Sequence, residues 1–353
     1  MRRRRLALLA IASLTALVVA FAGKARAEDD EPDLYYDWST MKLAADHLPE
    51  GWKLIQGASD LGGDQRLALH EGITESGKEA ANDPQMGDAF LQSIDVGDGK
   101  VATVALVDVK SKAQAFLKAL KPRAEKAAWA LREMGAPARL LLVAAPEDVK
   151  ARVVAVQSTW AARMLATSAV ERFDEHLANR AEPLAKAALA IEPGAARAHM
   201  ALGLVKKDML GQGSAPEAWD AVIAEFRAAT DEKAAIPLSE RETAQTRGEL
   251  GLALLERKNA NEEARDVLAK SVAGGALIDP QNALINRYNL ACAHGRLKEI
   301  DPAFEQLKTT LEDNKKVHFQ GLDWQNDHDF DNLHGDPRWE ELKKSFPKPS
   351  GGD

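Results

Sequence analysis

Alternating hydrophobic and smaller or polar positions are clearest between residues 90 and 107. Over Phe90–Val96, one side has Phe90, Gln92, Ile94 and Val96 and the other has Leu91, Ser93 and Asp95, and a second apolar run follows over Val101–Val107. Strict alternation is typical of β-strands because successive side chains point to opposite faces. Gly97-Asp98-Gly99 separates the two runs, so the pattern predicts an antiparallel β-hairpin. This turn is not a phosphate loop, since it lacks the lysine and the following helix of that motif.

Shorter patterns on either side of the hairpin complete an N-terminal module over residues 28–145. Trp52–Ile55 follows a Pro-Glu-Gly turn and predicts a short strand, and Leu140–Val143 is an apolar run that suits a buried strand. Ser111–Met134 has apolar residues at helical spacing, so a helix is predicted there, ending at Gly135-Ala136-Pro137. Strands and a helix in this order predict a small antiparallel α+β module.

The pattern becomes helical from residue 146. Pro146-Glu147-Asp148 is a typical helix start, with proline followed by acidic residues in the first turn. Apolar residues between Val149 and Leu165 then recur on one face, which predicts one long helix or two abutting helices. A β-rich conformation of Ala151–Gln157 is the alternative for this stretch.

Two helices of about a dozen residues are predicted within Ala283–Glu312, a usual helix length. Small and large apolar residues share the inner side of each helix, so the two can pack closely. Asp301-Pro302 predicts the start of the second helix, with Asp301 as the N-cap and proline at the first helical position.

Small residues recur along residues 161–346 where paired helices must approach closely. In the first helices they are Ala169, Gly203, Gly251 and Ala291, spaced by 34, 48 and 40 residues. In the second helices they are Ala181, Ala221 (or Ala218), Ala264 and Ala303, and prolines follow at Pro193, Pro237 and Pro280. This pattern resembles the tetratricopeptide repeat, whose period is about 34 residues. The segment ALAIEPGAARAHMALG, residues 188–203, carries the resemblance most clearly.

The sequence departs from the tetratricopeptide pattern in its spacing and at one residue position. The longer spacings need insertions at Met209–Ala215, at Lys233–Ser239 and at Gly274-Gly275, and His199 stands where the family usually has a large residue early in the first helix. A generic alanine-rich helical array is the alternative. The family resemblance implies that residues 146–320 form a solenoid of helical hairpins, which needs at least about three units for stability. The expected fold class is therefore α+β, a small N-terminal antiparallel module followed by an all-α solenoid.

In tetratricopeptide proteins the first helices line a concave groove that binds a protein or peptide. Carried onto this sequence, the groove positions are Arg197, Met200, Leu204 and Lys207, then Gln245, Gly248, Leu252 and Glu256, then Ile285, Tyr288, Cys292 and Arg296. The resemblance thus implies an apolar floor with basic residues, suited to a partner that carries carboxylates. Salt bridges from these basic residues to neighbouring acids are the alternative. The family's clamp for a C-terminal carboxylate is not found here.

Acidic residues and histidines are concentrated near the C-terminus: Asp327, His328, Asp329, Asp331, His334 and Asp336. Such side chains are common metal ligands, but the spacing is not that of an EF-hand. The segment resembles instead the ending of bacterial tetratricopeptide proteins. That resemblance implies that Phe330, Leu333 and Trp339 cover the last unit and that Asp336-Pro337 caps a final helix. We expect residues 321–353 to form a capping segment and tail, with no metal and no cofactor.

Residues 1–27 predict a secretory signal peptide. Arg2–Arg5 form a basic region, Leu6–Ala22 is an uncharged apolar run, and Ala25-Arg26-Ala27 is a cleavage site. An uncleaved membrane anchor is the alternative, because the apolar run is of borderline length for a membrane span. Cleavage before Glu28 predicts a periplasmic or secreted protein without a membrane span.

Charge and cysteine content narrow the classes of partner. Removal of residues 1–27 lowers Lys and Arg from 46 to 40 against 54 Asp and Glu, a balance of −14. This balance argues against nucleic acid or an anionic lipid surface as the partner. Cys292 is the single cysteine, so no internal disulfide forms, and we expect it to be a small buried residue rather than a nucleophile.

These observations favour an exported, non-enzymatic scaffold that binds a protein or peptide. An exported enzyme with residues 28–145 as its catalytic domain is one alternative, although the sequence contains no catalytic-triad order, zinc-protease motif or phosphate loop in support of it. An envelope assembly or structural protein is the other alternative.

Overall fold

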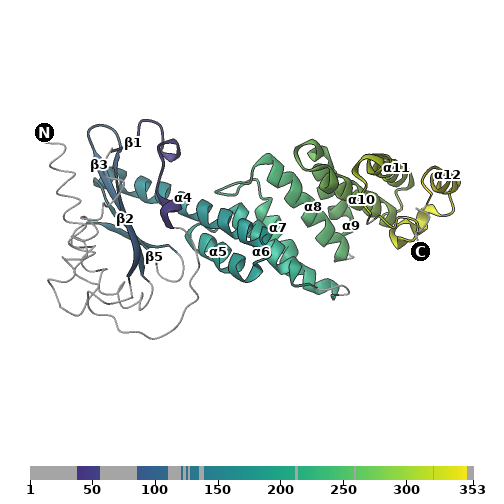
Figure 1. Cartoon of the computed structure of the whole chain (residues 1–353), viewed down its shortest axis with the longest axis horizontal. Helices are drawn as coiled ribbons and strands as arrows, with labels where there is room; N and C mark the ends of the chain where they lie inside the picture. Colours follow the sequence, from purple (N-terminus) through teal and green to yellow (C-terminus); the bar gives the residue numbers. More distant parts are fainter. Residues whose placement is uncertain are drawn as a thin grey trace. The chain divides into compact units, whose positions relative to one another are not determined.

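The computed structural model describes residues 38–55, 86–109, 121, 125, 128–134, 139–210, 214–257, 260–320 and 322–347. The predicted signal peptide and most of the predicted helix Ser111–Met134 lie outside these residues. The chain divides into two compact units, of which the first ends at Pro193 and the second spans Gly194–Asp353. The first unit contains a small antiparallel sheet and the second is helical (Figure 1).

Five strands among the described residues form one antiparallel sheet in the order β1-β2-β3-β5-β4. They are β1 Lys53–Leu54, β2 Met86–Asp95, β3 Val101–Val109, β4 Ala130–Glu133 and β5 Arg139–Ala144.

β2 pairs with β3, with Asp95 opposite Val101, which confirms the predicted hairpin. At its turn Gly97, Asp98 and Gly99 have φ of 88°, 51° and 76°. Glycine adopts this left-handed backbone without strain, which explains its use here. β1 and β5 confirm the two shorter predicted strands.

The end of the helix predicted over Ser111–Met134 is a strand instead. Ala130–Glu133 forms β4 and pairs with β5 along the edge of the sheet. Lys121 and Glu125 are helical, but Ala128 has φ of 55°, a left-handed conformation that interrupts a helix. Pairing with β5 satisfies backbone groups at the sheet edge, and this overrides the helical spacing of the apolar residues.

Helix α4, Glu147–Asp174, follows the sheet as one continuous helix. It confirms the predicted long helix and rules out the β-rich alternative for Ala151–Gln157. α4 packs on β4 and β5 and forms a hairpin with α5, Ala178–Ile191. Buried Gln157 donates to the backbone oxygen of Met41 at 2.8 Å, which ties α4 to the segment before the sheet. Both helices therefore belong to the unit that contains the sheet, whereas the sequence suggested a division at residue 146.

In the second unit the described helices form pairs that follow one another (Figure 1). α6 Ala196–Asp208 packs on α7 Asp220–Ala229, α8 Glu240–Glu256 on α9 Asn261–Ala273, and α10 Pro280–Arg296 on α11 Ile300–Val317. The 3₁₀ turns η4 Pro216–Trp219 and η5 Gly275–Leu277 precede α7 and α10. Successive pairs contact each other through α7 and α8 and through α9 and α10. Among the described residues, no helix combines the length and apolarity needed to cross a membrane.

Predicted small residues lie where paired helices touch. A Cβ atom on Gly203 of α6 would come within 2.5 Å of the Phe226 ring of α7, and one on Gly251 of α8 would overlap the side chain of Leu268. Both partner side chains are fully buried. The close approach of these helices therefore requires glycine at both positions, as the packing argument predicted.

The small position predicted for α7 is wrong. Ala221 and its alternative Ala218 are exposed, whereas Trp219, Val222 and Phe226 are buried. Since α7 begins at Asp220, its inner side passes through Val222 and Phe226, which are four residues apart and share a helix face.

α11 also begins earlier than predicted. Its first residue is Ile300 and its N-cap is Glu299, so Asp301 lies inside the first turn instead of capping it. Asp301 pairs with Arg338 at 2.8 Å instead. Pro302 is accommodated because the first turn of a helix leaves its backbone N–H groups unbonded.

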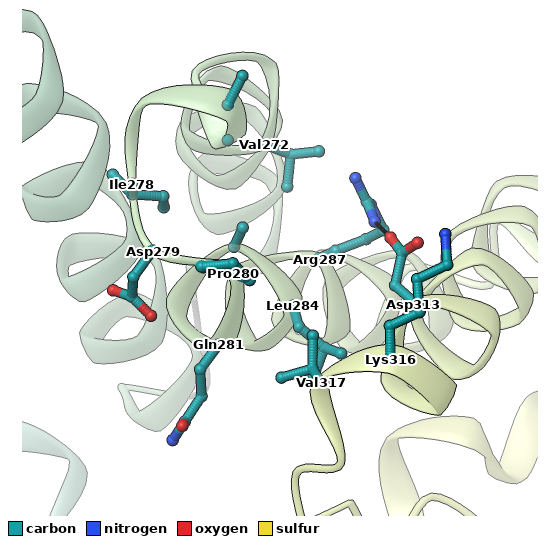
Figure 2. A pocket seen from close by; sticks show the side chains of 13 residues that line it. Val272, Ile278, Asp279, Pro280, Gln281, Leu284, Arg287, Asp313, Lys316 and Val317 are labelled. Atoms are coloured by element: carbon teal, nitrogen blue, oxygen red, sulfur yellow. Dashed lines mark hydrogen bonds and ion pairs between the residues drawn. The ribbon is translucent and has the colours of Figure 1, made fainter.

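A pocket lies where α9 ends, α10 begins and α11 ends (Figure 2). Its volume is about 800 Å³. Gly275, Ala276 and Ala283 line it with minimal side chains, and the nearest atom to a Cβ built on Gly275 would be the Ala283 Cβ, at 3.7 Å. These small residues leave the space open, which the sequence analysis did not anticipate.

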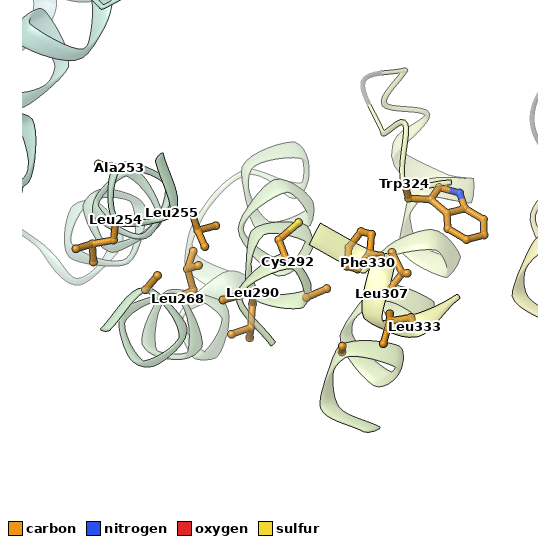
Figure 3. Packing of buried hydrophobic residues seen from close by; sticks show 14 of the residues in the cluster. Ala253, Leu254, Leu255, Leu268, Leu290, Cys292, Leu307, Trp324, Phe330 and Leu333 are labelled. Carbon is orange, nitrogen blue, oxygen red and sulfur yellow. The ribbon is translucent and has the colours of Figure 1, made fainter. Parts of the chain in front are cut away.

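The C-terminal segment continues the core of the second unit (Figure 3). It contains η6 His328–Leu333 and α12 Pro337–Ser345. Phe330 and Leu333 are fully buried and Trp339 is 4% exposed, in one cluster with Leu307 of α11. The Asp336 carboxylate accepts the backbone N–H of Arg338 at 2.9 Å, which confirms the predicted N-cap. The three apolar residues thus pack as the predicted cap requires.

Candidate functional site

Ion pairs connect α6 with α8 on the face that the sequence assigned to a groove. The Arg197 guanidinium lies 2.6 Å from the Glu242 carboxylate, and the Lys207 ammonium lies 2.5 Å from the Glu249 carboxylate. The Arg197 and Lys207 side chains keep 33% and 30% of their surface exposed. Both basic residues are therefore paired with acids of the neighbouring helix, as the salt-bridge alternative expected, yet both remain accessible.

Apolar and amide side chains lie between and next to these ion pairs along the two helices. Met200 is 7% exposed, Leu204 and Leu252 are half-buried, and Gln245 is exposed. On each helix these residues are three or four positions apart, so they lie on one face of that helix. We call this surface the α6–α8 strip; it consists of Arg197, Met200, Leu204, Lys207, Glu242, Gln245, Glu249 and Leu252.

Gly248, also predicted to line the groove, packs against a different helix. A Cβ atom there would overlap the Asn286 side chain of α10. Asn286 donates to the Ser271 hydroxyl at 3.0 Å, and that hydroxyl donates to the backbone oxygen of Ala244 at 2.6 Å. Gly248 therefore admits a buried hydrogen-bond network between helices and does not belong to the strip.

The predicted groove positions on α10 hold the chain's own C-terminal segment. The Tyr288 hydroxyl donates to Asp327 at 2.6 Å, and the Arg296 guanidinium donates to Asp329 at 2.6 Å. Arg296 also donates to the backbone oxygen of Leu255 at 2.5 Å. Of these positions, the basic residue Arg296 does bind a carboxylate, but it is that of Asp329 in the chain's own C-terminal segment.

Burial shifts the pKa values of two side chains that contact Asp327 and Asp329. It raises the pKa of the Cys292 thiol well above its ordinary value, and the carboxylates of Asp327 and Asp329 raise it further. Burial likewise raises the pKa of the Tyr288 hydroxyl, with the nearby Cys292 and Asp327 adding to the effect. Both groups therefore stay protonated at neutral pH, and Cys292 behaves as the buried residue that the sequence predicted.

Cys292, Asp327 and Asp329 place their donor atoms within 4.8 Å of one another, a spacing that metal ligands can have. Their bonding assigns them another role. Asp329 holds Arg296, and Asp327 accepts both the Tyr288 hydroxyl and the backbone N–H of Asp329, the latter at 3.0 Å. A thiol must lose its proton to bind a metal, and burial opposes that loss here. We assign this cluster to anchoring the C-terminal segment.

A second ion network joins α6 to α7, and the sequence analysis did not identify it. Glu225 lies 2.7 Å from the His199 Nδ1 atom and 2.5 Å from the Lys206 ammonium. Burial raises the pKa of the Glu225 carboxyl, but His199 and Lys206 outweigh burial and lower that pKa below its ordinary value. His199 and Lys206 are seven residues apart, so they share a helix face, and that spacing is the signal that could have found the network.

Comparisons of the chain with protein-family models, with curated proteins and with solved structures found no match. The assignment of function therefore depends on the residues of this chain.

Proposed function

We propose that the protein is an exported, non-enzymatic scaffold of the tetratricopeptide type, whose helix pairs form a solenoid that binds a protein or peptide. The α6–α8 strip is the observation that carries this proposal. It combines accessible basic groups at Arg197 and Lys207 with the half-buried apolar side chains of Leu204 and Leu252. Such a mixture suits a partner segment with carboxylates beside apolar residues.

Binding at the strip requires an exchange of ion pairs. A partner carboxylate that approaches Lys207 competes with Glu249, and one that approaches Arg197 competes with Glu242. Ion pairs with this degree of exposure contribute only about 0–1 kcal/mol each to stability, so replacing them costs little free energy. The intramolecular pairs hold the basic side chains in place before binding, and this lowers the entropy lost when the partner arrives.

Three of the described groups that could act in catalysis, Cys292, His199 and His294, make contacts within the fold, which supports a non-enzymatic role. Cys292 is a buried thiol held in its protonated form. His199 and His294 are engaged by Glu225 at 2.7 Å and Glu299 at 2.5 Å. Protonation keeps the Cys292 thiol in its unreactive form, and a glutamate carboxylate contacts each of these two imidazoles.

Site-specific photocrosslinking in the native compartment tests the proposal. A photoreactive residue in place of exposed Gln245 should crosslink one defined partner, because this position is at the centre of the strip. The same residue in place of exposed Glu262, on α9, is the matched control and should not capture that partner. Equal capture at both positions would contradict the strip as the binding surface.

Charge exchange separates a role in binding from a role in folding. Lys207→Glu should weaken the affinity for the purified partner by about tenfold, which corresponds to about 1.4 kcal/mol. The double variant Lys207→Glu with Glu249→Lys restores the ion pair with reversed polarity. The double variant should have the unfolding free energy of the wild type and still bind the partner weakly. Wild-type affinity in the double variant would contradict the proposal.

Export is the second part of the proposal, and it rests on the basic region, apolar run and cleavage site of residues 1–27. Intact-mass spectrometry of the protein from its native source should give a mature chain that begins at Glu28. A chain that retains Met1–Ala27 would contradict export with cleavage.

A further inference from the structure

The pocket between α9, α10 and α11 has an apolar floor. Val272 comes from α9, Ile278 from the turn that follows, Pro280 and Leu284 from α10, and Val317 from the end of α11. Figure 2 shows these side chains around one space, with Leu284 beside Val317. A volume of about 800 Å³ lies within the range of natural small-ligand sites.

Opposite charges lie at the two ends of this floor (Figure 2). Asp279 lies at one end, where one carboxylate oxygen accepts the backbone N–H of Asn282 at 3.0 Å and the other accepts the side-chain amide of Asn282. Lys316 lies at the other end, beside the ion pair of Arg287 with Asp313. Arg287 and Asp313 neutralise each other, and among the described residues Lys316 and Asp279 have no ion-pair partner. The pocket is thus anionic at Asp279 and cationic at Lys316.

The separation of the charged ends sets the length of a ligand. Asp279 and Arg287 are eight positions apart along α10, which at 1.5 Å per residue is about 12 Å. Figure 2 shows the Lys316 side chain directed toward the Arg287–Asp313 ion pair, on the side of the pocket away from Asp279, so the cationic end lies at about this distance. An extended peptide advances about 3.3–3.6 Å per residue. Three or four residues therefore span the pocket.

We propose that this pocket binds a free apolar peptide of three or four residues, with its amino group at Asp279 and its carboxylate at Lys316. The apolar side chains of the peptide cover Ile278, Leu284 and Val317. An internal segment of a protein has no terminal amino group for Asp279 and no terminal carboxylate for Lys316, and a protein C-terminus supplies only the carboxylate. A free peptide satisfies both charges at once.

Calorimetric titration of the full chain with leucyl-alanyl-leucine tests this assignment. The free tripeptide should bind, and its N-acetylated and C-amidated forms should each bind at least fivefold more weakly, because each lacks one of the two terminal charges. Absence of binding at millimolar peptide, or equal affinity for all three forms, would overturn the proposal.

Substitutions in the pocket locate the binding. Lys316→Ala should weaken binding of the free tripeptide but leave that of its amide unchanged, whereas Lys308→Ala, at an exposed position of α11 outside the pocket, should change neither. Asp279→Asn keeps an N-cap side chain and should weaken binding of the free peptide only. Ala276→Leu should block the space. If all three pocket variants bind like the wild type, the peptide does not occupy this pocket.

The pocket and the α6–α8 strip have no residue in common. A failed peptide titration therefore leaves the proposed scaffold function unaffected, and a strip that fails to capture a partner leaves the peptide pocket unaffected.

Discussion

At the scale of single residues, the close packing of the helix pairs depends on glycine, which has no side chain. Gly203 and Gly251 admit Phe226 and Leu268 between paired helices. The sequence allowed these positions to be found, because a small residue in an otherwise apolar helix face predicts a close crossing. It did not show which neighbour fills the space at Gly248, because Asn286 lies on another pair and the contact depends on how the pairs stack.

Gly251→Ala should lower the free energy of unfolding. The added methyl group overlaps buried Leu268, and overpacking costs about 1–3 kcal/mol. Alanine recovers about 1 kcal/mol of helix propensity, so a net loss of up to about 2 kcal/mol is expected. Urea denaturation measures it. Gly335→Ala, where no atom lies within 4 Å of the added Cβ, is the control and should have a smaller effect. A stabilised Gly251→Ala protein would contradict this packing.

Cys292 should be protected from alkylation in the folded protein. Burial, together with Asp327 and Asp329, raises the pKa of the thiol, and only the thiolate reacts. The rate of reaction with iodoacetamide at neutral pH should be on the order of 100-fold lower than in urea, where the same residue is exposed. Mass spectrometry over time measures both rates. Similar rates in the two conditions would mean that the C-terminal segment does not cover Cys292.

At the scale of elements, the C-terminal segment stabilises α10 and α11 through a few large side chains. Phe330→Ala should lower the free energy of unfolding by about 3–5 kcal/mol, because Phe330 is fully buried and its removal leaves a cavity. Thermal unfolding followed by circular dichroism measures the change. Met209→Ala, at a side chain that is 75% exposed, is the control and should change stability by less than about 0.5 kcal/mol. Equal melting temperatures for both variants would show that the segment does not act as a cap.

Acid should weaken the α6–α7 pair through Glu225. The folded protein holds the pKa of this carboxyl below its ordinary value of 4.5, so the stabilisation is complete above pH 4.5 and is lost as the pH falls below it. Urea midpoints of the wild type should therefore fall more between pH 7 and pH 3.5 than those of Glu225→Gln, which has no charge to lose. Glu262→Gln, at an exposed position, should follow the wild type. Parallel curves for wild type and Glu225→Gln would contradict this role.

Elements differ in how far the sequence could predict them. The hairpin of β2 and β3 and the capped α12 were predictable because their signals are local: alternation with a Gly-Asp-Gly turn, and Asp followed by Pro. The strand Ala130–Glu133 was not, because β5 imposes it from outside the segment. The covering of Tyr288 and Arg296 was missed for the same reason, since Asp327 and Asp329 are more than thirty residues away in the chain.

At the scale of the whole molecule, the two compact units decide where the chain can be divided. The sequence placed a boundary at residue 146, where helices replace strands. The structure places it after Pro193, because α4 packs on β4 and β5 and buried Gln157 bonds to Met41. The two boundaries lead to different expectations for isolated fragments.

A fragment of residues 194–353 should fold by itself. Its core is one cluster that extends from Trp219 to Leu342 and includes residues of α7 to α12. A fragment that begins at Glu147 adds α4, whose buried Val153 and Gln157 pack in the first unit with the sheet. Exposure of that face favours association, so this longer fragment should elute as oligomers in size-exclusion chromatography while residues 194–353 elute as a monomer with a cooperative melt. A monomeric, cooperative longer fragment beside an unfolded shorter one would place the boundary at residue 146.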